Sequence, residues 1–130
     1  MNLNQVTVPA INVAASVAFY EALGLQLIVY TEDTYARFEC PKGGSTFSVH
    51  KVDNLPKGSG VYTYFEVNDV AAKVTELRTK GIAVDEGPVE QSWLWTEARL
   101  RDPSNNQIII YHAGDHRKNP PWRISNDAGN

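Results

Sequence analysis

The amino-acid sequence contains one unit twice, and this repeat constrains the fold more than any other feature. A shift of 57 positions places the stretch that begins at Val13 on the stretch that begins at Val70. Five positions are then identical, and the predicted strand before the helix also falls in the matching place. The identical pairs are Val13 and Val70, Ala14 and Ala71, Ala15 and Ala72, Val17 and Val74, and, after the helix, Gly24 and Gly81. A repeat of this size predicts two equivalent modules that pack against each other.

Each copy reads as a strand, a helix and three further strands. In the first copy, apolar alternation and turn residues predict strands at 3–9, 26–30, 35–40 and 46–51 and a helix at 13–23. The second copy predicts strands at 61–67, 84–90, 96–101 and 107–112 and a helix at 70–80. Residues 53–60 predict a linker, and 114–130 predict a tail with neither helix nor strand. We therefore expect a single domain over 1–130, with modules at about 3–52 and 61–113.

The pattern predicts an α+β fold in which two tandem βαβββ modules form a curled mixed sheet around a small-molecule cavity. Helices are expected on one face of the sheet, and the other face is expected to line the hollow. Because strand side chains alternate, the packing face should carry Val6, Val8, Phe47, Val49, Val61, Phe65, Val67, Ile108 and Ile110. The hollow should be lined by Gln5, Thr7, Thr46, Ser48, His50, Tyr62, Tyr64, Glu66, Ile109 and Tyr111.

Composition excludes several classes of partner. The formal net charge is −3, the sequence pI is about 5.5, and lysine and arginine form no cluster, which disfavours a nucleic-acid partner. No apolar run is long enough to span a bilayer, and the first residues lack the basic and apolar regions of a signal peptide. Cys40 is the only cysteine, so no internal disulfide can form, and we expect a reducing, cytoplasmic location.

Two segments resemble a known family. The stretch Ser16-Val17-Ala18-Phe19-Tyr20-Glu21-Ala22-Leu23-Gly24 is similar to the S-x-x-F-Y-x-x-L-G signature of the vicinal oxygen chelate superfamily. That superfamily includes glyoxalase I, extradiol dioxygenases, fosfomycin-resistance enzymes and bleomycin-resistance proteins. The stretch Asp102-Pro103-Ser104-Asn105-Asn106 resembles its D-P-x-G-N turn, with Asn105 where glycine is usual. The resemblance covers roughly residues 3–113 and implies the paired-module fold; the fold alone does not define an activity.

The resemblance also implies where a metal would be bound. Metal enzymes of the family take His, Glu or Gln ligands from the first and last strands of each module, and the matching positions here are Gln5, His50 (or Ser48, one pleat away), Tyr62 and Ile109. Isoleucine cannot bind a metal and neutral tyrosine is a weak ligand, so we expect no tightly bound metal. An alternative set would place Tyr111, Glu66 or Glu97 beside His50.

Single residues suggest further roles. His50 is a candidate catalytic base or ligand, or else a solvated histidine at a strand end. Tyr62, Tyr64 and Tyr111 form a candidate aromatic wall for a flat ligand. Arg37 and Glu39, on one face of their strand beside Tyr35, would bind a charged substrate or form ordinary cross-strand pairs on the surface.

The tryptophans and the assembly complete these expectations. Trp93 and Trp95 precede a strand in a loop, where two tryptophans suit either a ligand lid or a dimer interface. Trp122 is expected to anchor the tail, and Asp102 to cap its turn. We also expect a homodimer, as the resemblance implies.

Two functional hypotheses follow. In the first, the chain binds a small aromatic or cationic molecule and its metal site is degenerate. The aromatic lining, the incomplete ligand set and the mild acidity favour this hypothesis. In the second, it is a divergent metal-dependent lyase, isomerase or dioxygenase that uses Gln5 and His50 with Zn, Ni, Mn or Fe.

Overall fold

The computed structural model describes residues 1–125. The first module consists of β1 (Gln5–Ala10), α1 (Val13–Leu23), β2 (Gln26–Thr31), β3 (Tyr35–Glu39) and β4 (Thr46–Lys51). The second consists of β5 (Tyr62–Glu66), α2 (Val70–Thr79), β6 (Glu86–Glu90), β7 (Thr96–Arg101) and β8 (Gln107–His112). A short 3-10 helix, η1 (Gly114–Arg117), follows β8. The two tandem βαβββ modules predicted from the repeat are confirmed.

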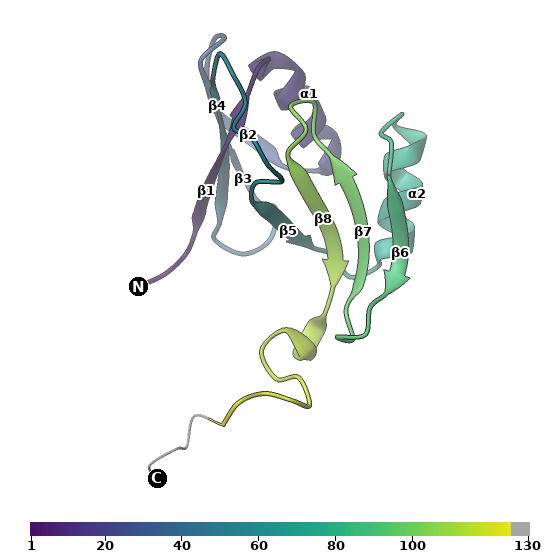
Figure 1. Ribbon diagram of the computed structural model, residues 1–130. Helices are drawn as coiled ribbons and strands as arrows, with labels where there is room; N and C mark the ends of the chain where they lie inside the picture. The colour runs from purple at the N-terminus through teal and green to yellow at the C-terminus, as the bar shows by residue number, and fades with distance from the viewer. Residues whose placement is uncertain (126–130) are drawn as a thin grey trace.

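The two modules have the same sheet topology (Figure 1). The strand order is β1-β4-β3-β2 in the first sheet and β5-β8-β7-β6 in the second. In each sheet the first strand of the module pairs in parallel with the last, and the remaining pairs are antiparallel. This mixed pairing allows equivalent positions to be compared directly: Thr7 pairs with Ser48 as Tyr64 pairs with Ile109.

Both helices begin with matching caps. The side chain of Asn12 accepts a hydrogen bond from the Ala15 N–H, and Asp69 accepts one from the Ala72 N–H. Each cap satisfies an N–H group that the first helical turn leaves without a partner. Helix α1 ends at Gly24, whose φ of 111° lies in the left-handed region that glycine tolerates. The predicted boundaries of both helices are therefore correct to within one residue.

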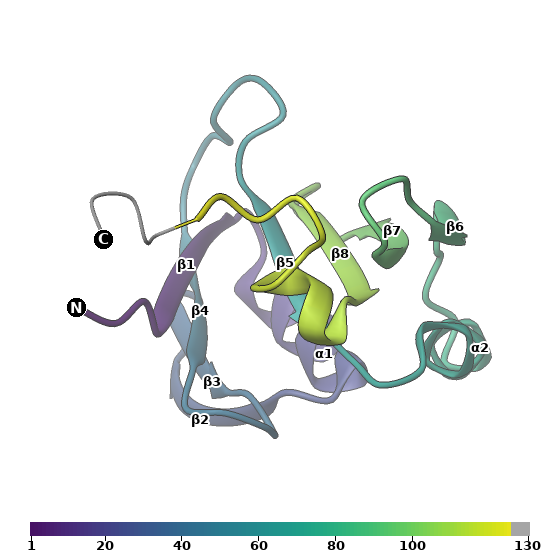
Figure 2. The same ribbon diagram turned by 90° about the horizontal axis from the view of Figure 1, so that it is seen from below.

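Helix α1 lies in the angle between the two sheets, whereas α2 packs on the second sheet, near β6 (Figure 2). Apolar residues from both modules form one core there, and they include Val8, Val13, Tyr20, Phe38, Phe47, Val49, Val74, Leu77, Leu100, Ile108 and Ile110. The rings of Phe47 and Phe65 meet across the module boundary with centroids 5.5 Å apart. The predicted packing faces are thus correct, apart from Val61, which lies before β5 and is 70 % exposed.

A buried hydrogen bond locks α1 onto the second module. The Tyr20 hydroxyl donates to Asp102 Oδ2 over 2.6 Å, and Asp102 Oδ1 accepts from the N–H groups of Ser104 and Asn106. Burial, together with the nearby carboxylate, raises the pKa of Tyr20 well above its usual value, so the hydroxyl remains a donor. Asp102 caps its turn as predicted and also joins the two family-like motifs.

The arrangement corrects the expectation of one shared hollow. Because α1 packs between the sheets, the helix-covered faces share the core, and the helix-free faces lie on the outside of the angle (Figure 2). Gln5 and His50 therefore lie on one outer face and Tyr62 and Tyr111 on the other. Alternation assigns a side chain to a face of its own sheet, but it does not fix how two sheets are oriented.

Two expectations about the tail are also corrected. Residues Gly114–Arg117 form η1, which begins where the backbone N–H groups of Ala113 and Gly114 donate to the Glu66 carboxylate. Trp122 is 56 % exposed, so it does not anchor the tail within this chain. Within residues 1–125, no helix has the length and apolar character needed to cross a bilayer.

Replacing Tyr20 with phenylalanine should destabilise the fold by about 2 kcal/mol, since the change removes a donor from a buried, charged acceptor. Urea unfolding followed by circular dichroism measures the loss. The matched control is Tyr30→Phe, because Tyr30 lies on an exposed strand and is itself 44 % exposed. Equal stability of the two variants would contradict the role given to the Tyr20–Asp102 bond.

Candidate functional site

A cleft of about 880 Å³ opens between the modules at the end of the molecule that carries the N-terminus and η1. The start of β1, the loop from Cys40 to Ser45, the end of α1 and residues 63–68 line it, together with Tyr111, His112, Gly114 and Arg117. Five of the residues predicted to face the hollow line it, namely Gln5, Thr46, Tyr64, Glu66 and Tyr111. Its volume lies in the range of small-molecule sites.

Three rings form an aromatic wall on the helix-free face of the second sheet; we use this name for Tyr64, Trp95 and Tyr111. Trp95 and Tyr111 are stacked with centroids 4.8 Å apart, and Tyr64 meets both edge-on at 5.9 and 5.5 Å. Tyr111 is buried beneath the others with Ile109, whereas Tyr64 is 42 % exposed. Two members of the wall line the cleft, so the wall and the cleft form a continuous surface.

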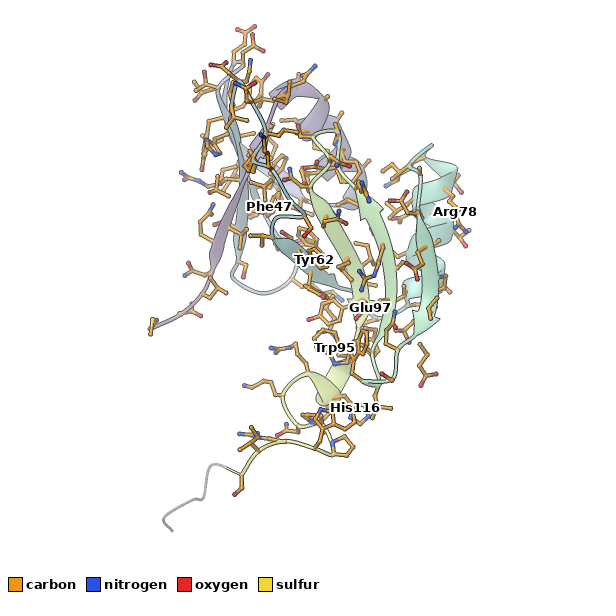
Figure 3. The ribbon with its side chains drawn as sticks, viewed as in Figure 1. Phe47, Tyr62, Arg78, Trp95, Glu97 and His116 are labelled. Carbon is orange, nitrogen blue, oxygen red and sulfur yellow. The ribbon has the colours of Figure 1, made fainter. Side chains whose placement is uncertain are left out.

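A buried carboxylate lies beside the wall (Figure 3). Glu97, which is 2 % exposed, accepts hydrogen bonds from Trp93 Nε1 at 2.8 Å and from Arg99 Nη2 at 3.3 Å. The Arg99 guanidinium also lies 5.9 Å from the centre of the Tyr62 ring. Burial and the charge of Glu97 raise the pKa of Tyr64, against the smaller effect of Arg99, so the Tyr64 hydroxyl is neutral near pH 7.

A chain of hydrogen bonds occupies the helix-free face of the first sheet. Gln5 Nε2 donates to Ser48 Oγ at 2.8 Å, Ser48 Oγ lies 2.6 Å from the Tyr35 hydroxyl, and Arg37 Nε donates to that hydroxyl at 2.9 Å. Gln5 Nε2 also lies 3.0 Å from Thr7 Oγ1. Ser48 is fully buried, so it fixes the positions of the side chains that it contacts.

Tyr35 shows how strongly this network is polarised. Burial alone would raise the pKa of its hydroxyl, but the hydrogen bonds from Ser48 and Arg37 and the charge of Arg37 together lower it below the usual value. Arg37 lies 5.4 Å from the centre of the Tyr35 ring, in the geometry of a cation–π contact.

The positions that the family resemblance implies do not supply the donors of a divalent metal. Gln5 pairs with Thr46 and Pro9 with His50, so Gln5 and His50 are about 13 Å apart along the sheet at the usual rise per residue. Ser48, which does lie beside Gln5, offers only a hydroxyl, and its counterpart Ile109 is a buried hydrocarbon. Within residues 1–125, no three His, Cys, Asp or Glu side chains converge on one point.

The alternative ligands are also engaged elsewhere. Glu66 accepts the N–H groups of Ala113 and Gly114; burial opposes ionisation, but these two hydrogen bonds and the nearby His112 lower the pKa of the carboxyl below its usual value. His112 Nδ1 lies 2.9 Å from the Val67 carbonyl. His50 is exposed on β4 opposite Tyr35, in the first sheet, whereas Glu66 and Glu97 belong to strands of the second sheet.

The structure thus separates the predicted site residues into groups. Gln5 and Ser48 are joined on the first sheet, and Tyr64, Trp95, Ile109 and Tyr111 cluster on the second. Tyr62 contacts Arg99, and Trp93 binds Glu97. Tyr35 and Arg99 were not predicted as site residues, although their register positions on β3 and β7 put both on the helix-free faces.

The Arg37→Gln variant should raise the pKa of Tyr35, because it removes a hydrogen bond and a positive charge that both favour the phenolate. The pKa is measured by a pH titration of protein labelled with ¹³Cζ-tyrosine. Arg78→Gln is the control, since Arg78 is exposed on α2, far from β3 (Figure 3). An unchanged Tyr35 titration in Arg37→Gln would show that Arg37 does not polarise this hydroxyl.

Comparisons with known proteins agree with this architecture. A lactoylglutathione lyase from Agrobacterium tumefaciens superposes with a TM-score of 0.71 at 18% identity, over 85% of this chain and 92% of that one. A glyoxalase/bleomycin resistance protein/dioxygenase from Nocardioides gives 0.75 at 19%, over 96% and 90%. A family enzyme from Burkholderia phytofirmans PsJN gives 0.73 at 20%, over 87% and 99%. At these identities the likeness shows the fold alone.

Curated proteins gave no match. The family model described as the Glyoxalase/Bleomycin resistance protein/Dioxygenase superfamily, however, matches residues 2–110. This span covers the first module, the second module as far as the middle of β8, and both motifs that carried the resemblance. The chain therefore belongs to the glyoxalase/bleomycin resistance protein/dioxygenase superfamily.

Proposed function

We propose that this protein binds a small aromatic molecule on the aromatic wall and in the adjoining cleft, without a resident divalent metal. The observation that carries the proposal is the stack of Trp95 on Tyr111, with Tyr64 standing edge-on beside it and partly exposed. A ligand ring would extend this cluster by the same offset-stacked or edge-to-face contacts, which contribute about 1 kcal/mol per ring pair beyond buried area.

The charge beside the wall bears on which ligands are accepted. The acidic sequence and Glu97 would favour a cationic ring, but Glu97 already has Arg99 and Trp93 as donors. Electrostatic attraction to this carboxylate is therefore largely compensated within the chain. We expect ring shape to contribute more to affinity at the wall than ligand charge does.

The metal-enzyme hypothesis has less support. Its two proposed ligands are Gln5 and His50. Gln5 pairs with Thr46, which lies four positions before His50 on β4, and the Gln5 side chain already contacts Ser48 and Thr46. Bound metals require several donors that converge within about 2 Å of the ion. The metal-enzyme hypothesis is therefore tested, as the alternative, by measuring the metal content of the protein.

We further propose a homodimer in the cytoplasm. Both helix-free faces carry exposed apolar and aromatic side chains that no element of the described residues covers, among them Tyr62, Tyr64 and Trp93. A second copy would bury part of this surface and would bring an aromatic wall opposite another module. The cysteine, which forms no disulfide, supports a reducing compartment.

Replacing Trp95 with alanine should weaken binding of 2-naphthol by about tenfold, because it removes the stacked partner of the wall. Isothermal titration calorimetry measures the affinity, and (2-naphthyl)trimethylammonium tests the effect of a positive charge. Trp122→Ala is the matched control, since Trp122 lies in the exposed tail. Sedimentation velocity of both variants tests assembly: loss of the dimer with unchanged naphthol binding would assign Trp95 to the dimer interface instead.

Protein purified without a polyhistidine tag should contain far less than one divalent metal ion per chain, since the donor set is incomplete. Inductively coupled plasma mass spectrometry for Zn, Ni, Mn and Fe measures the content. A stoichiometric metal that is lost in His50→Ala but kept in His116→Ala would overturn the metal-free proposal. His116 is a suitable control because it lies in η1, on another part of the chain.

A further inference from the structure

The repeat places an arginine at the same position in both modules. Arg37 on β3 pairs with Ser48 on β4, and Arg99 on β7 pairs with Ile109 on β8. Ser48 and Ile109 are themselves equivalent, because they pair with Thr7 and Tyr64 at matching positions of β1 and β5. Both arginines therefore lie on helix-free faces, and each contacts a tyrosine ring at 5.4 or 5.9 Å.

The two arginines differ in what balances their charge. Arg99 forms an ion pair with the buried Glu97. The position equivalent to Glu97 in the first module is Tyr35, since Tyr35 pairs with His50 as Glu97 pairs with Tyr111. Arg37 thus has a phenol where Arg99 has a carboxylate. Among the described residues Arg37 makes no ion pair.

The surroundings of Arg37 offer hydrogen-bond donors in excess. Its Nε is occupied by the Tyr35 hydroxyl, which leaves the four N–H groups of its terminal nitrogens. The Tyr35 and Ser48 hydroxyls share one hydrogen bond, and each oxygen also accepts from a further donor, Arg37 Nε or Gln5 Nε2. Whichever of the two hydroxyls accepts in their shared bond therefore keeps its own hydrogen free. A partly buried guanidinium that is held in place and lacks a carboxylate is suited to an external acceptor, and its planar fork matches two oxygens of an anion.

We propose that the helix-free face of the first sheet holds an oxyanion-binding site, in which Arg37, positioned by Tyr35 and Ser48, binds a carboxylate or phosphate group of a small molecule. Tyr35 fixes the guanidinium through Nε and leaves its terminal nitrogens to contact the anion. Buried Ser48 contacts the Tyr35 hydroxyl in turn, and Gln5 donates to Ser48. Within one chain this site lies on a different sheet from the aromatic wall, so the two proposals can be tested independently of each other.

The test uses small probes that have no ring. The Arg Nε–Hε signals are followed by ¹⁵N–¹H NMR while the full chain is titrated with sodium acetate, sodium phosphate or uncharged acetamide, at ionic strength held constant with NaCl. We expect a saturable shift of the Arg37 signal with acetate, phosphate or both, and none with acetamide. The relative affinities distinguish a carboxylate site from a phosphate site.

Two variants examine the origin of the binding. Arg37→Gln should weaken anion binding, followed through the amide signals of β3 and β4, by at least fivefold, whereas Arg78→Gln should leave it unchanged. Tyr35→Glu keeps Arg37 but gives it the neighbour that Arg99 has, so it should also weaken binding by at least fivefold. Thermal unfolding of each variant verifies that it is folded. If Arg37→Gln fails to fold, Arg37→Lys replaces it, because lysine keeps the positive charge but lacks the planar guanidinium. Anion binding by Arg37→Lys should be about threefold weaker than that of the original chain.

The proposal is overturned if acetate and phosphate shift the Arg37 signal no more than acetamide does. It is overturned as well if folded Arg37→Gln, or Arg37→Lys in its place, binds the anions as the original chain does. If anion binding is lost while Trp95-dependent binding of 2-naphthol persists, the two sites are distinct. Absence of anion binding would refute the oxyanion site, and absence of 2-naphthol binding would separately refute the proposed function.

Discussion

The hydrogen bond from Tyr20 to Asp102 determines how the two halves of the molecule meet. It is short, buried and formed between a helix of the first module and a turn of the second. Without Tyr20 the buried Asp102 carboxylate would lose one of its donors and keep only those of its own turn, so the bond opposes any movement of α1 away from the second sheet. Nearby, Ile11 N–H donates to Ser104 Oγ and Asn106 Nδ2 donates to the Pro9 carbonyl, which adds two further cross-module contacts. The angle between the sheets, and with it the cleft, depends on this junction.

Much of the fold could be predicted because the signals were local. Repetition located both modules, and the alternation of apolar residues correctly separated Ile108 and Ile110 from Ile109 and Tyr111. The relative orientation of the sheets could not be predicted, since it depends on side chains distant in sequence, such as Tyr20 and Asp102. For that reason Gln5 and Tyr111 were rightly placed on helix-free faces, and both contribute to the cleft, whereas His50 and Tyr62, which were expected to share a hollow with them, do not line it.

The candidate site was predictable in residue type and only partly in geometry. Aromatic residues at Tyr64, Trp95 and Tyr111 were identified, but their stacking depends on how β5, β8 and the loop before β7 pack. The link between Arg37 and Tyr35 spans two positions of one strand, yet its importance appears only when Glu97 is seen at the equivalent place in the other module. Asn105 illustrates a departure from the family pattern that the chain accommodates: its φ of 68° is left-handed, and its side chain accepts a hydrogen bond from Arg101 that glycine could not offer.

The equivalence of Tyr35 and Glu97 has a consequence for how such a protein diverges. A duplicated fold begins with two identical faces, and selection can alter one of them while the other keeps its ancestral balance of charges. Here one side chain beside each arginine decides whether that arginine is neutralised internally or carries an uncompensated charge. The core residues beneath are unaffected by that choice, so recognition in the first half can evolve without a penalty to the packing that both halves share.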